Sequence, residues 1–227
     1  MSRRNRFIEK PARRTARAWW ALVLAASAVA LVPALPVRAQ AAPVIANAES
    51  SAPAAPLPGA QLVAALRRGG YVIYFRHTAT DFSKNDSGMT GYDDCQNQRL
   101  LSAQGRRDAT EIGRRIRALR LAGGEVLASP FCRTMDHARL MLDTATPRVE
   151  IREGEGGDYA GLKRLLASRV APGRNRWIVG HGSPFRAVAG PPHLAEGEAA
   201  VIEPGGTGWT VIARIKVEDW PAFAAAP

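Results

Sequence analysis

The sequence is poor in the residues that usually hold metals or cross-link chains: it has two cysteines and four histidines among 227 residues. No pair of histidines has H-x-x-x-H spacing and the cysteines do not cluster, so no metal ligand set is predicted. The chain also contains no internal repeat. We therefore expect a non-repetitive protein that works without a metal or another cofactor.

A second absence is an apolar run long enough to span a bilayer. The uncharged core at residues 19–32 is 14 residues long, whereas a transmembrane helix takes about 20. It follows a basic segment and precedes the A-x-A-like Val37-Arg38-Ala39, which is the layout of a secretory signal peptide. We expect residues 1–39 to be cleaved and the protein to be periplasmic or secreted, with membrane attachment only if this segment is retained. Arginine pairs at 3–4 and 13–14 leave the general and the twin-arginine export routes both open.

Most of the net charge of +11 belongs to this leader. Residues 1–39 hold eight Arg/Lys and one Glu, which leaves 23 basic and 19 acidic residues and a net charge of +4. The remainder has no basic run interleaved with aromatic residues, so nucleic-acid binding is not predicted. A modest positive charge still favours the attraction of anionic substrates.

Composition divides the rest of the chain into two parts. Residues 40–59 are rich in Ala and Pro with scattered Ser, and we interpret them as a loose linker without a core. Residues 60–227 form the predicted domain, in which about 160 residues can build a single hydrophobic core.

Strand-like and helix-like segments alternate through this domain. Such alternation predicts an α/β fold, a three-layer α/β/α sandwich with a mostly parallel central sheet. Ser102 is expected to cap the first helix, and four residues at helical spacing give that helix an apolar face: Ala109, Ile112, Ile116 and Leu119. The expected strands are 71–75, 125–128, 149–151, 176–179, 199–202 and 209–215, and the expected helices are 102–121, 132–143 and 159–168.

Three of the expected strands end on residues suited to a phosphoryl group. The first ends on Arg76-His77, the second leads to Ser129 and Arg133, and a later one leads to Gly180-His181-Gly182. The carboxyl ends of parallel strands lie along one edge of a sheet, where ligands bind. Arg76 and His77 alone could merely cap a strand, but three such endings are hard to explain as packing because unpaired buried charges are costly.

These residues, in this order, resemble the motifs of the histidine phosphatase superfamily, phosphoglycerate-mutase-like branch. Arg76-His77 matches its R-H-G signature except at Thr78, residues 129–133 match S-P-x-x-R, and residues 180–182 match G-H-G. Residues 101–109 match the family stretch L-(S/T)-x-x-G-x-x-x-A. The resemblance runs from about residue 71 to residue 215 and implies a phosphoglycerate-mutase-like fold.

The catalytic acid of that branch usually lies in the pattern L-x-E-x-x-x-G-x-x-x-G. Here Ile151-Arg152-Glu153 is followed by glycines at 157 and 161, the same spacing with Ile for Leu. The resemblance therefore selects Glu153 over the neighbouring acids at 155 and 158. A Gly-rich acidic surface loop is the alternative interpretation of this stretch.

The resemblance implies a phosphohistidine mechanism without a metal. His77 would be the nucleophile and must be neutral to attack. Arg76 and Arg133 would clamp phosphoryl oxygens with planar, permanently charged forks. His181, protonated when phosphate is bound, would add a third positive donor. Glu153 would protonate the leaving alcohol and then activate water against the phosphohistidine.

Three further positions depart from the family pattern or lack a role in it. Thr78 replaces the signature glycine, and we interpret it as tolerated, either as an added phosphate donor or as a residue that narrows the pocket. His137 stands where the family often has Thr, so a surface or supporting position is expected rather than a ligand. His193 lies among prolines in an expected solvent-exposed loop and has no predicted role.

The two cysteines permit either a disulfide or two free thiols. Export makes a disulfide possible, and both Cys95 and Cys132 are expected near the same edge of the sheet. A bridge would close about 38 residues and stabilise the fold by about 4 kcal/mol through chain entropy. Cys132 is not expected to be a nucleophile, because the C-x5-R loop of cysteine phosphatases is absent.

The spacing after the predicted acid bears on the type of reaction. Only 23 residues separate Glu153 from Trp177, too few for the large insertion that closes over the substrate in mutases of the family. We therefore expect a phosphomonoesterase acting on a phosphorylated small molecule, with envelope sugar or lipopolysaccharide phosphates as candidate substrates. A protein phosphohistidine phosphatase is an alternative. Two other classes stay open: a non-catalytic module of the same fold that binds phosphorylated ligands, and a structural envelope domain tethered by an uncleaved N-terminal helix.

Overall fold

The computed structural model describes residues 59–153 and 157–223, so the predicted signal peptide and all but the last residue of the predicted linker lie outside the described residues. Six strands form one sheet in the order β3-β2-β4-β1-β5-β6. Their bounds are β1 (Val72–Arg76), β2 (Val126–Ala128), β3 (Thr146–Pro147), β4 (Arg176–Gly180), β5 (Ala199–Pro204) and β6 (Trp209–Ile215). The first four pair in parallel, whereas β5 is antiparallel to both β1 and β6, so among the described strands β5 alone runs against the others. The predicted mostly parallel sheet is confirmed.

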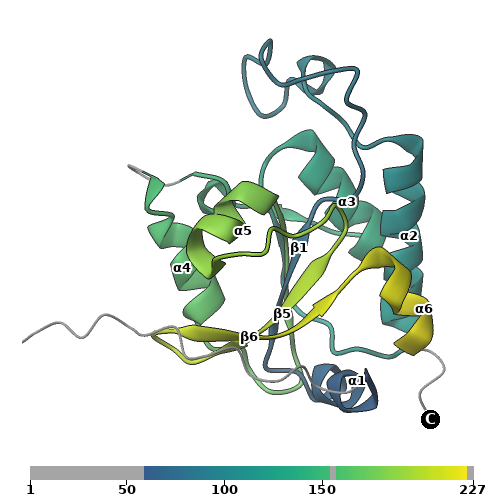
Figure 1. Cartoon of the computed structure of the whole chain (residues 1–227), viewed down its shortest axis with the longest axis vertical. Helices are drawn as coiled ribbons and strands as arrows, with labels where there is room; N and C mark the ends of the chain where they lie inside the picture. The colour runs from purple at the N-terminus through teal and green to yellow at the C-terminus, as the bar shows by residue number, and fades with distance from the viewer. Residues whose placement is uncertain (1–58, 154–156, 224–227) are drawn as a thin grey trace, which may run out of the picture. The chain divides into compact units, whose positions relative to one another are not determined.

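Helices cover both faces of this sheet (Figure 1). The helices α2 (Ala103–Ala118), α3 (Cys132–Leu142) and α6 (Trp220–Phe223) contribute to one hydrophobic core, together with α1 (Gly59–Arg68). The helices α4 (Ala160–Ala167) and α5 (Gly182–Ala189) contribute to a second core on the opposite face. This is the predicted three-layer α/β/α arrangement.

Strand β1 shows why one sheet can carry two cores. Ile73 and Phe75 belong to the core beneath α2 and α3, whereas Val72 and Tyr74 belong to the core beneath α4 and α5. Side chains alternate between the faces of a strand, and a strand covered on both faces needs apolar residues at every position. All four side chains are accordingly buried.

The predicted helix after Ser102 forms, with its apolar face buried. The Ser102 hydroxyl accepts a hydrogen bond from the Gly105 amide, as expected of a helix cap, and Ala109, Ile112 and Ile116 are buried. The helix ends at Ala118, three residues earlier than predicted.

The strand predicted at residues 149–151 is wrong. These residues form a short 3-10 helix, η2 (Val149–Ile151), and the edge strand β3 lies just before it, pairing with β2. Arg148 donates its amide to the Ala128 carbonyl at 2.8 Å, after which the chain turns away from the sheet edge. Ile151 is then fully buried in the core beneath α4 and α5. Its side chain packs in this core although its backbone is not part of the sheet.

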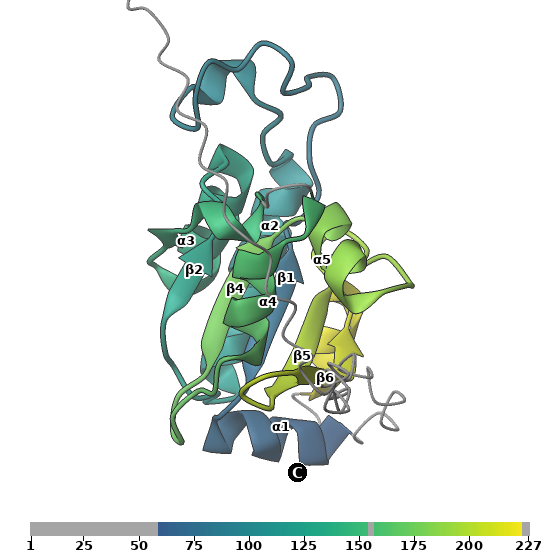
Figure 2. The ribbon, with the colours of Figure 1, turned by 90° about the vertical axis from the view of Figure 1, so that its left-hand side faces the viewer.

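Two loops meet at the edge where β1 ends. The segment that follows β1 contains the short helix η1 (Cys95–Asn97) and rises beyond the sheet at the end opposite α1 (Figures 1 and 2). The segment before β5 reaches the same edge, because β5 is antiparallel and its first residue, Ala199, pairs with Phe75. In residues 59–153 and 157–223, no helix combines the length and apolar character needed to cross a membrane.

Candidate active site

Three strand ends bring the predicted site residues to one edge of the sheet. The His77 amide, just past β1, donates to the Gly180 carbonyl at 3.0 Å. On the other side of β4 the Ser129 amide donates to the Val179 carbonyl at 2.9 Å. The imidazole rings of His77 and His181 consequently lie with their centroids 5.5 Å apart.

His77 is buried, and its ring orientation is set by its own backbone. Nδ1 lies 2.9 Å from the Thr78 carbonyl oxygen, so a neutral ring donates from Nδ1 and keeps its lone pair on Nε2. Burial is the main reason that the pKa of His77 is lowered to about 3, although the hydrogen bond to Thr78 acts in the opposite direction. The charges of Arg133, Arg76 and Arg99 lower this pKa as well. The ring is therefore neutral at pH 7, as a nitrogen nucleophile must be.

His181 is held at both its backbone and its ring. The Tyr74 hydroxyl donates to the His181 carbonyl and accepts from the His181 amide, each at 2.9 Å. Nε2 lies 2.9 Å from the Ser129 hydroxyl oxygen. A Cβ at Gly180 would lie 2.1 Å from the Tyr74 hydroxyl oxygen. Glycine before His181 therefore leaves room for the two hydrogen bonds between Tyr74 and the His181 backbone.

Burial, followed by the charge of Arg133, lowers the pKa of His181 well below its ordinary value. A phosphoryl anion beside this cation would offset its effect and favour the protonated ring. Protonation of His181 in the bound state stays a prediction.

Arg133 reaches the site from the first turn of α3. Its side chain is only 5% exposed, and Nη1 donates to Asp86 Oδ1 at 2.9 Å and to the Arg99 carbonyl at 3.2 Å. The guanidinium carbon lies 4.5 Å from the centre of the Phe131 ring. Among the described residues, Nε of Arg133 has no hydrogen-bond partner although it is buried.

Arg76 is held by a different loop. Its side chain is 22% exposed, and Nη1 donates to the Leu194 carbonyl at 2.8 Å. Nη2 lies 3.5 Å from Glu196 Oε1, which also accepts a hydrogen bond from the Thr80 hydroxyl at 3.0 Å. Sequence reasoning missed Glu196, because no motif marks it and the loop path alone brings it to Arg76.

His193, which had no predicted role, lies beside the same arginine. Its Nδ1 is 3.4 Å from Arg76 Nη1 and 2.8 Å from the Leu194 carbonyl oxygen. A Cβ at Gly182 would lie 1.8 Å from the His193 ring. The ring therefore packs directly against this second glycine of G-H-G, where a side chain would not fit. The residue is exposed, as expected, but its ring belongs to the rim of the site.

Two further arginines, Arg99 and Arg152, lie near His181. The charges of Arg152 and Arg99 both contribute to the lowered pKa of His181. Arg99 stacks on the exposed ring of Phe82, with its guanidinium carbon 4.6 Å from the ring centre, and Arg152 lies 6.0 Å from the ring centre of Phe131. The sequence analysis assigned a role to neither, although Arg99 stands just before the L-(S/T)-x-x-G stretch and Arg152 stands inside the pattern that selected Glu153.

Thr78 and His137 lie next to His77. The Thr78 amide donates to His137 Nδ1 at 3.2 Å, and the Thr78 hydroxyl is buried without a partner among the described residues. His137 is fully buried, and burial, followed by the effect of His77, lowers its pKa to about 3. Of the two positions expected for His137, the structure shows the supporting one.

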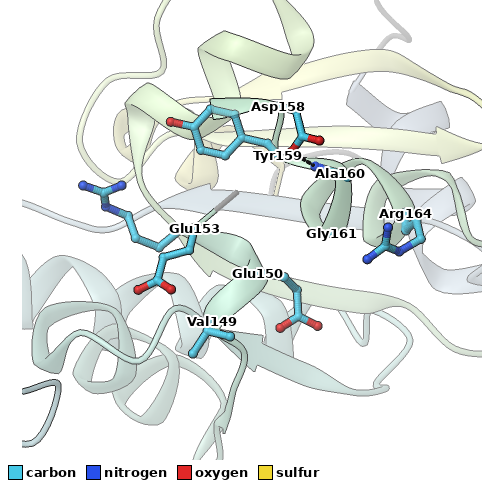
Figure 3. A pocket seen from close by; sticks show the side chains of 9 residues that line it. Val149, Glu150, Glu153, Asp158, Tyr159, Ala160, Gly161 and Arg164 are labelled. Carbon is cyan, nitrogen blue, oxygen red and sulfur yellow. Dashed lines mark hydrogen bonds between the residues drawn. The ribbon is translucent and has the colours of Figure 1, made fainter. Parts of the chain in front are cut away.

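Glu153 lies on the exposed rim, outside the buried cluster. Together with Arg152 it lines two cavities, one of about 700 Å³ over η2 and the start of α4, and one of about 300 Å³ against the loop after β1. In the larger cavity the side chains of Glu150 and Glu153 project on the same side, across from Asp158 and Tyr159 (Figure 3). The smaller cavity is bounded by Met89, Thr90, Gly91, Tyr92 and Phe131.

The two cysteines are joined in a disulfide. The Cα atoms of Cys95 and Cys132 lie 5.8 Å apart. Gln98 adds two hydrogen bonds to this link: its Oε1 accepts from the Cys132 amide, and its Nε2 donates to the Tyr92 carbonyl, each at 2.9 Å. The loop after β1 is therefore tied to the turn that carries Arg133.

The charged groups of the site do not form a metal-binding cluster. Within residues 59–153 and 157–223, no three His, Cys, Asp or Glu side chains are placed together so as to hold a metal ion.

A model of one protein family matches this chain. It is described as the histidine phosphatase superfamily (branch 1), and the match covers residues 72–192, more than half of the sequence. The chain therefore belongs to the histidine phosphatase superfamily, branch 1. No curated protein matches the sequence.

Solved structures show likenesses at low identity. The protein histidine phosphatase SixA complexed with tungstate is 17% identical, with a TM-score of 0.48 over 65% of this chain and 97% of that chain. Bacillus stearothermophilus YhfR is 16% identical, with a TM-score of 0.43 over 63% and 95% of the two chains. The mycobacterial glucosyl-3-phosphoglycerate phosphatase Rv2419c is 15% identical, with a TM-score of 0.46 over 64% and 98%.

Proposed function

We propose that this member of the histidine phosphatase superfamily is an exported, metal-independent phosphomonoesterase that works through a phosphohistidine on His77. The observation that carries the proposal is the state of the His77 ring, which is neutral, hydrogen-bonded at Nδ1, and without a partner at Nε2 in the described part of the chain. Arg76, Arg133 and His181 supply the surrounding cationic and imidazole donors. Such donors stabilise charge on a transferring phosphoryl group, while the uncharged nucleophile avoids repulsion by the substrate.

The proposed reaction has two steps. In the first, Nε2 of His77 forms a bond to phosphorus while the bond from phosphorus to the leaving oxygen breaks, and Glu153 gives that oxygen a proton. In the second, the Glu153 carboxylate takes a proton from water, whose oxygen bonds to phosphorus while the bond from phosphorus to Nε2 of His77 breaks, which releases inorganic phosphate and the free imidazole. Acid–base assistance of this type is worth about 10²–10⁴ in rate. Glu153 lines the smaller cavity together with Phe131, whose ring centre lies 5.1 Å from that of His181, and this position supports the role.

The proposed substrate is a phosphorylated small molecule, with sugar phosphates of the cell envelope as the favoured class. The smaller cavity, which borders the site at Phe131 and is also lined by Arg152 and Glu153, offers room for a leaving group larger than phosphate itself. Export is supported by the leader-like composition of residues 1–39. The disulfide between Cys95 and Cys132 also supports it, because such bonds persist in oxidising compartments.

Hydrolysis in the presence of EDTA tests the proposal. The protein is assayed with an aryl phosphate and with a panel of sugar and alkyl phosphates, and the phosphoenzyme is trapped by rapid denaturation. We expect turnover, a trapped phosphohistidine, and loss of both in His77→Ala. Glu153→Gln should lower the rate by about 10² or more on sugar phosphates and less on the aryl phosphate, whose leaving group needs no proton. Glu203→Gln, an exposed glutamate on β5 away from the end that pairs with Phe75, is the matched control and should keep its activity.

A second candidate is a non-catalytic module that binds phosphorylated ligands. It is favoured by the exposed position of Glu153, whose carboxylate has no hydrogen-bond partner among the described residues. Measurable phosphate binding without turnover on any substrate of the panel, with a phosphohistidine peptide included, would replace the enzyme proposal by this one.

A further inference from the structure

The guanidinium of Arg133 presents its two edges to different surroundings. Nη1 is occupied by Asp86 Oδ1 at 2.9 Å and by the Arg99 carbonyl at 3.2 Å. Nε is buried without a partner, and no hydrogen bond to Nη2 occurs among the described residues. The edge formed by Nε and Nη2 is one of those through which a guanidinium binds two oxygens of an anion at once.

We propose that Asp86 is a positioning residue, which holds Arg133 by Nη1 and thereby turns its Nε–Nη2 edge toward the phosphoryl group. This inference rests on the proposed function and identifies a residue that no motif marks. A planar guanidinium pinned at one corner cannot rotate about its long side chain, so its free edge keeps one direction. Reaction rates depend steeply on the position of such groups, since a displacement of about 1 Å can lower the rate about 10²-fold.

Asp86 is itself held in place. Its Oδ1 accepts a hydrogen bond from the Arg99 amide at 2.9 Å in addition to the one from Arg133. Partial burial raises the pKa of Asp86, but the hydrogen bonds from Arg99 and Arg133 outweigh burial, so that the pKa lies below its ordinary value. The Asp86 carboxylate is therefore negatively charged at neutral pH and forms an ion pair with Arg133.

The loop that carries Asp86 is bound to the element that carries Arg133. Cys95 is joined to Cys132, the residue before Arg133, and the Cys132 amide donates to Gln98 Oε1 at 2.9 Å. Both the disulfide and this hydrogen bond restrict movement of the loop relative to α3. Asp86 and Arg133, 47 residues apart in sequence, consequently stay in contact.

An opposite role for Asp86 gives opposite predictions. A carboxylate that merely competes with phosphate for Arg133 would weaken phosphate binding, and removing it would strengthen binding. A positioning carboxylate improves binding and rate, and removing it harms both. The amide of Asn keeps an oxygen that can accept from Arg133 Nη1 and from the Arg99 amide, so Asn should rescue a positioning role that Ala abolishes.

The experiment compares wild type, Asp86→Ala, Asp86→Asn and the control Asp93→Ala, an exposed aspartate of the same loop. Calorimetry measures the Kd of inorganic phosphate, and kinetics with a sugar phosphate measure kcat and KM. We expect Asp86→Ala to weaken phosphate binding about tenfold and to lower kcat about 30- to 100-fold. We expect Asp86→Asn to stay within about fivefold of wild type in both, and Asp93→Ala to match wild type.

Three results would overturn the inference: phosphate binding that is unchanged or tighter in Asp86→Ala, equal losses in the Ala and Asn variants, or an equal loss in Asp93→Ala. The phosphate Kd separates this inference from the proposed function. If the wild type binds phosphate but hydrolyses nothing, the enzyme proposal fails, whereas the effect of Asp86 on phosphate binding is still measured. Asp86→Asn also keeps the test valid if Asp86→Ala does not fold.

Discussion

Two arginines are proposed to bind the phosphoryl group, and the protein holds them in different ways. Arg133 is 5% exposed and lies 2.9 Å from Asp86, on a loop that a disulfide ties to α3. Arg76 is 22% exposed, and its nearest carboxylate, on Glu196, lies 3.5 Å away. A short contact to a buried guanidinium fixes the direction of that group, whereas a longer contact to a partly exposed guanidinium is weakened by water and by side-chain freedom. The site thus combines a buried cation in a short ion pair with a more exposed cation in a longer one.

Replacing each arginine by lysine tests this difference most strongly, because lysine keeps the charge but loses the planar fork. We expect Arg133→Lys to lower kcat/KM by about 10²–10³, part of the roughly 10³–10⁵ that one arginine supplies in other phosphoryl-transfer enzymes. Arg76→Lys should have an effect about ten times smaller, since its donors are less strictly aimed. Steady-state kinetics with a sugar phosphate measure both, and equal losses would show that the two arginines are held alike.

Breaking the disulfide should loosen the Arg133 side alone. Cys95→Ser or Cys132→Ser removes a cross-link whose chain entropy is worth about 4 kcal/mol, so the free energy of unfolding in urea should fall by up to that amount. We also expect kcat/KM to fall about tenfold, because the loop bearing Asp86 is no longer anchored. Wild type treated with a reducing agent is the matched comparison. A folded variant with unchanged kcat/KM would show that the hydrogen bonds of Gln98 anchor the loop without help.

The two arginines should differ in their effect on the histidines. A nearby cation penalises the protonated imidazole, so removing it raises the pKa. Arg133 lowers the pKa of both His77 and His181, whereas Arg76 contributes to the shift of His77 and is not among the causes of the shift of His181. NMR titration should therefore show both values raised in Arg133→Gln, and only that of His77 raised in Arg76→Gln. A rise for His181 of the same size in both variants would contradict this asymmetry.

The smallest effect is expected at Glu196. Its contact with Arg76 is long and partly exposed, and ion pairs of this type contribute about 0.2–1 kcal/mol. Glu196→Gln keeps an oxygen for the Thr80 hydroxyl, so we expect KM to change by no more than about threefold and kcat to stay unchanged. Kinetics of Glu196→Gln beside Asp86→Ala make the comparison. A loss at Glu196 as large as that at Asp86 would mean that Arg76 is also strictly positioned.

The strand ends could be predicted from the sequence because their positions follow from local rules. Arg76-His77 and Gly180-His181 come directly after runs of buried residues, and parallel pairing then places such ends at one edge. The mostly parallel sheet and the burial of the α2 face followed from the same periodicity. The order of three short motifs along the chain indicated the family.

The loop contacts could not be predicted, because they depend on paths that no periodicity describes. His193 lies beside Arg76 across 117 residues, and Asp86 meets Arg133 across 47. Residues 149–151 show a related limit, since two β-branched residues favour a strand, yet burial of Ile151 beneath α4 decides the local conformation.

The direction of strand β5 has a consequence for how such a site can change over time. In a wholly parallel sheet the segment that leads into a strand lies at the edge away from the ligand. Because β5 is reversed, the segment before it arrives at the ligand edge, and its Leu194 and Glu196 reach Arg76. Gly197 and Glu198 at its end bond to the backbone of Arg76 and His77, whereas residues 191–196 form no strand pairs in the described part of the chain, so insertions or substitutions before Gly197 leave the register of β1 and β5 intact. Because of the reversed strand, substitutions in this loop could change the proposed substrate preference while His77, the proposed nucleophile, and the residues around Arg133 stay the same.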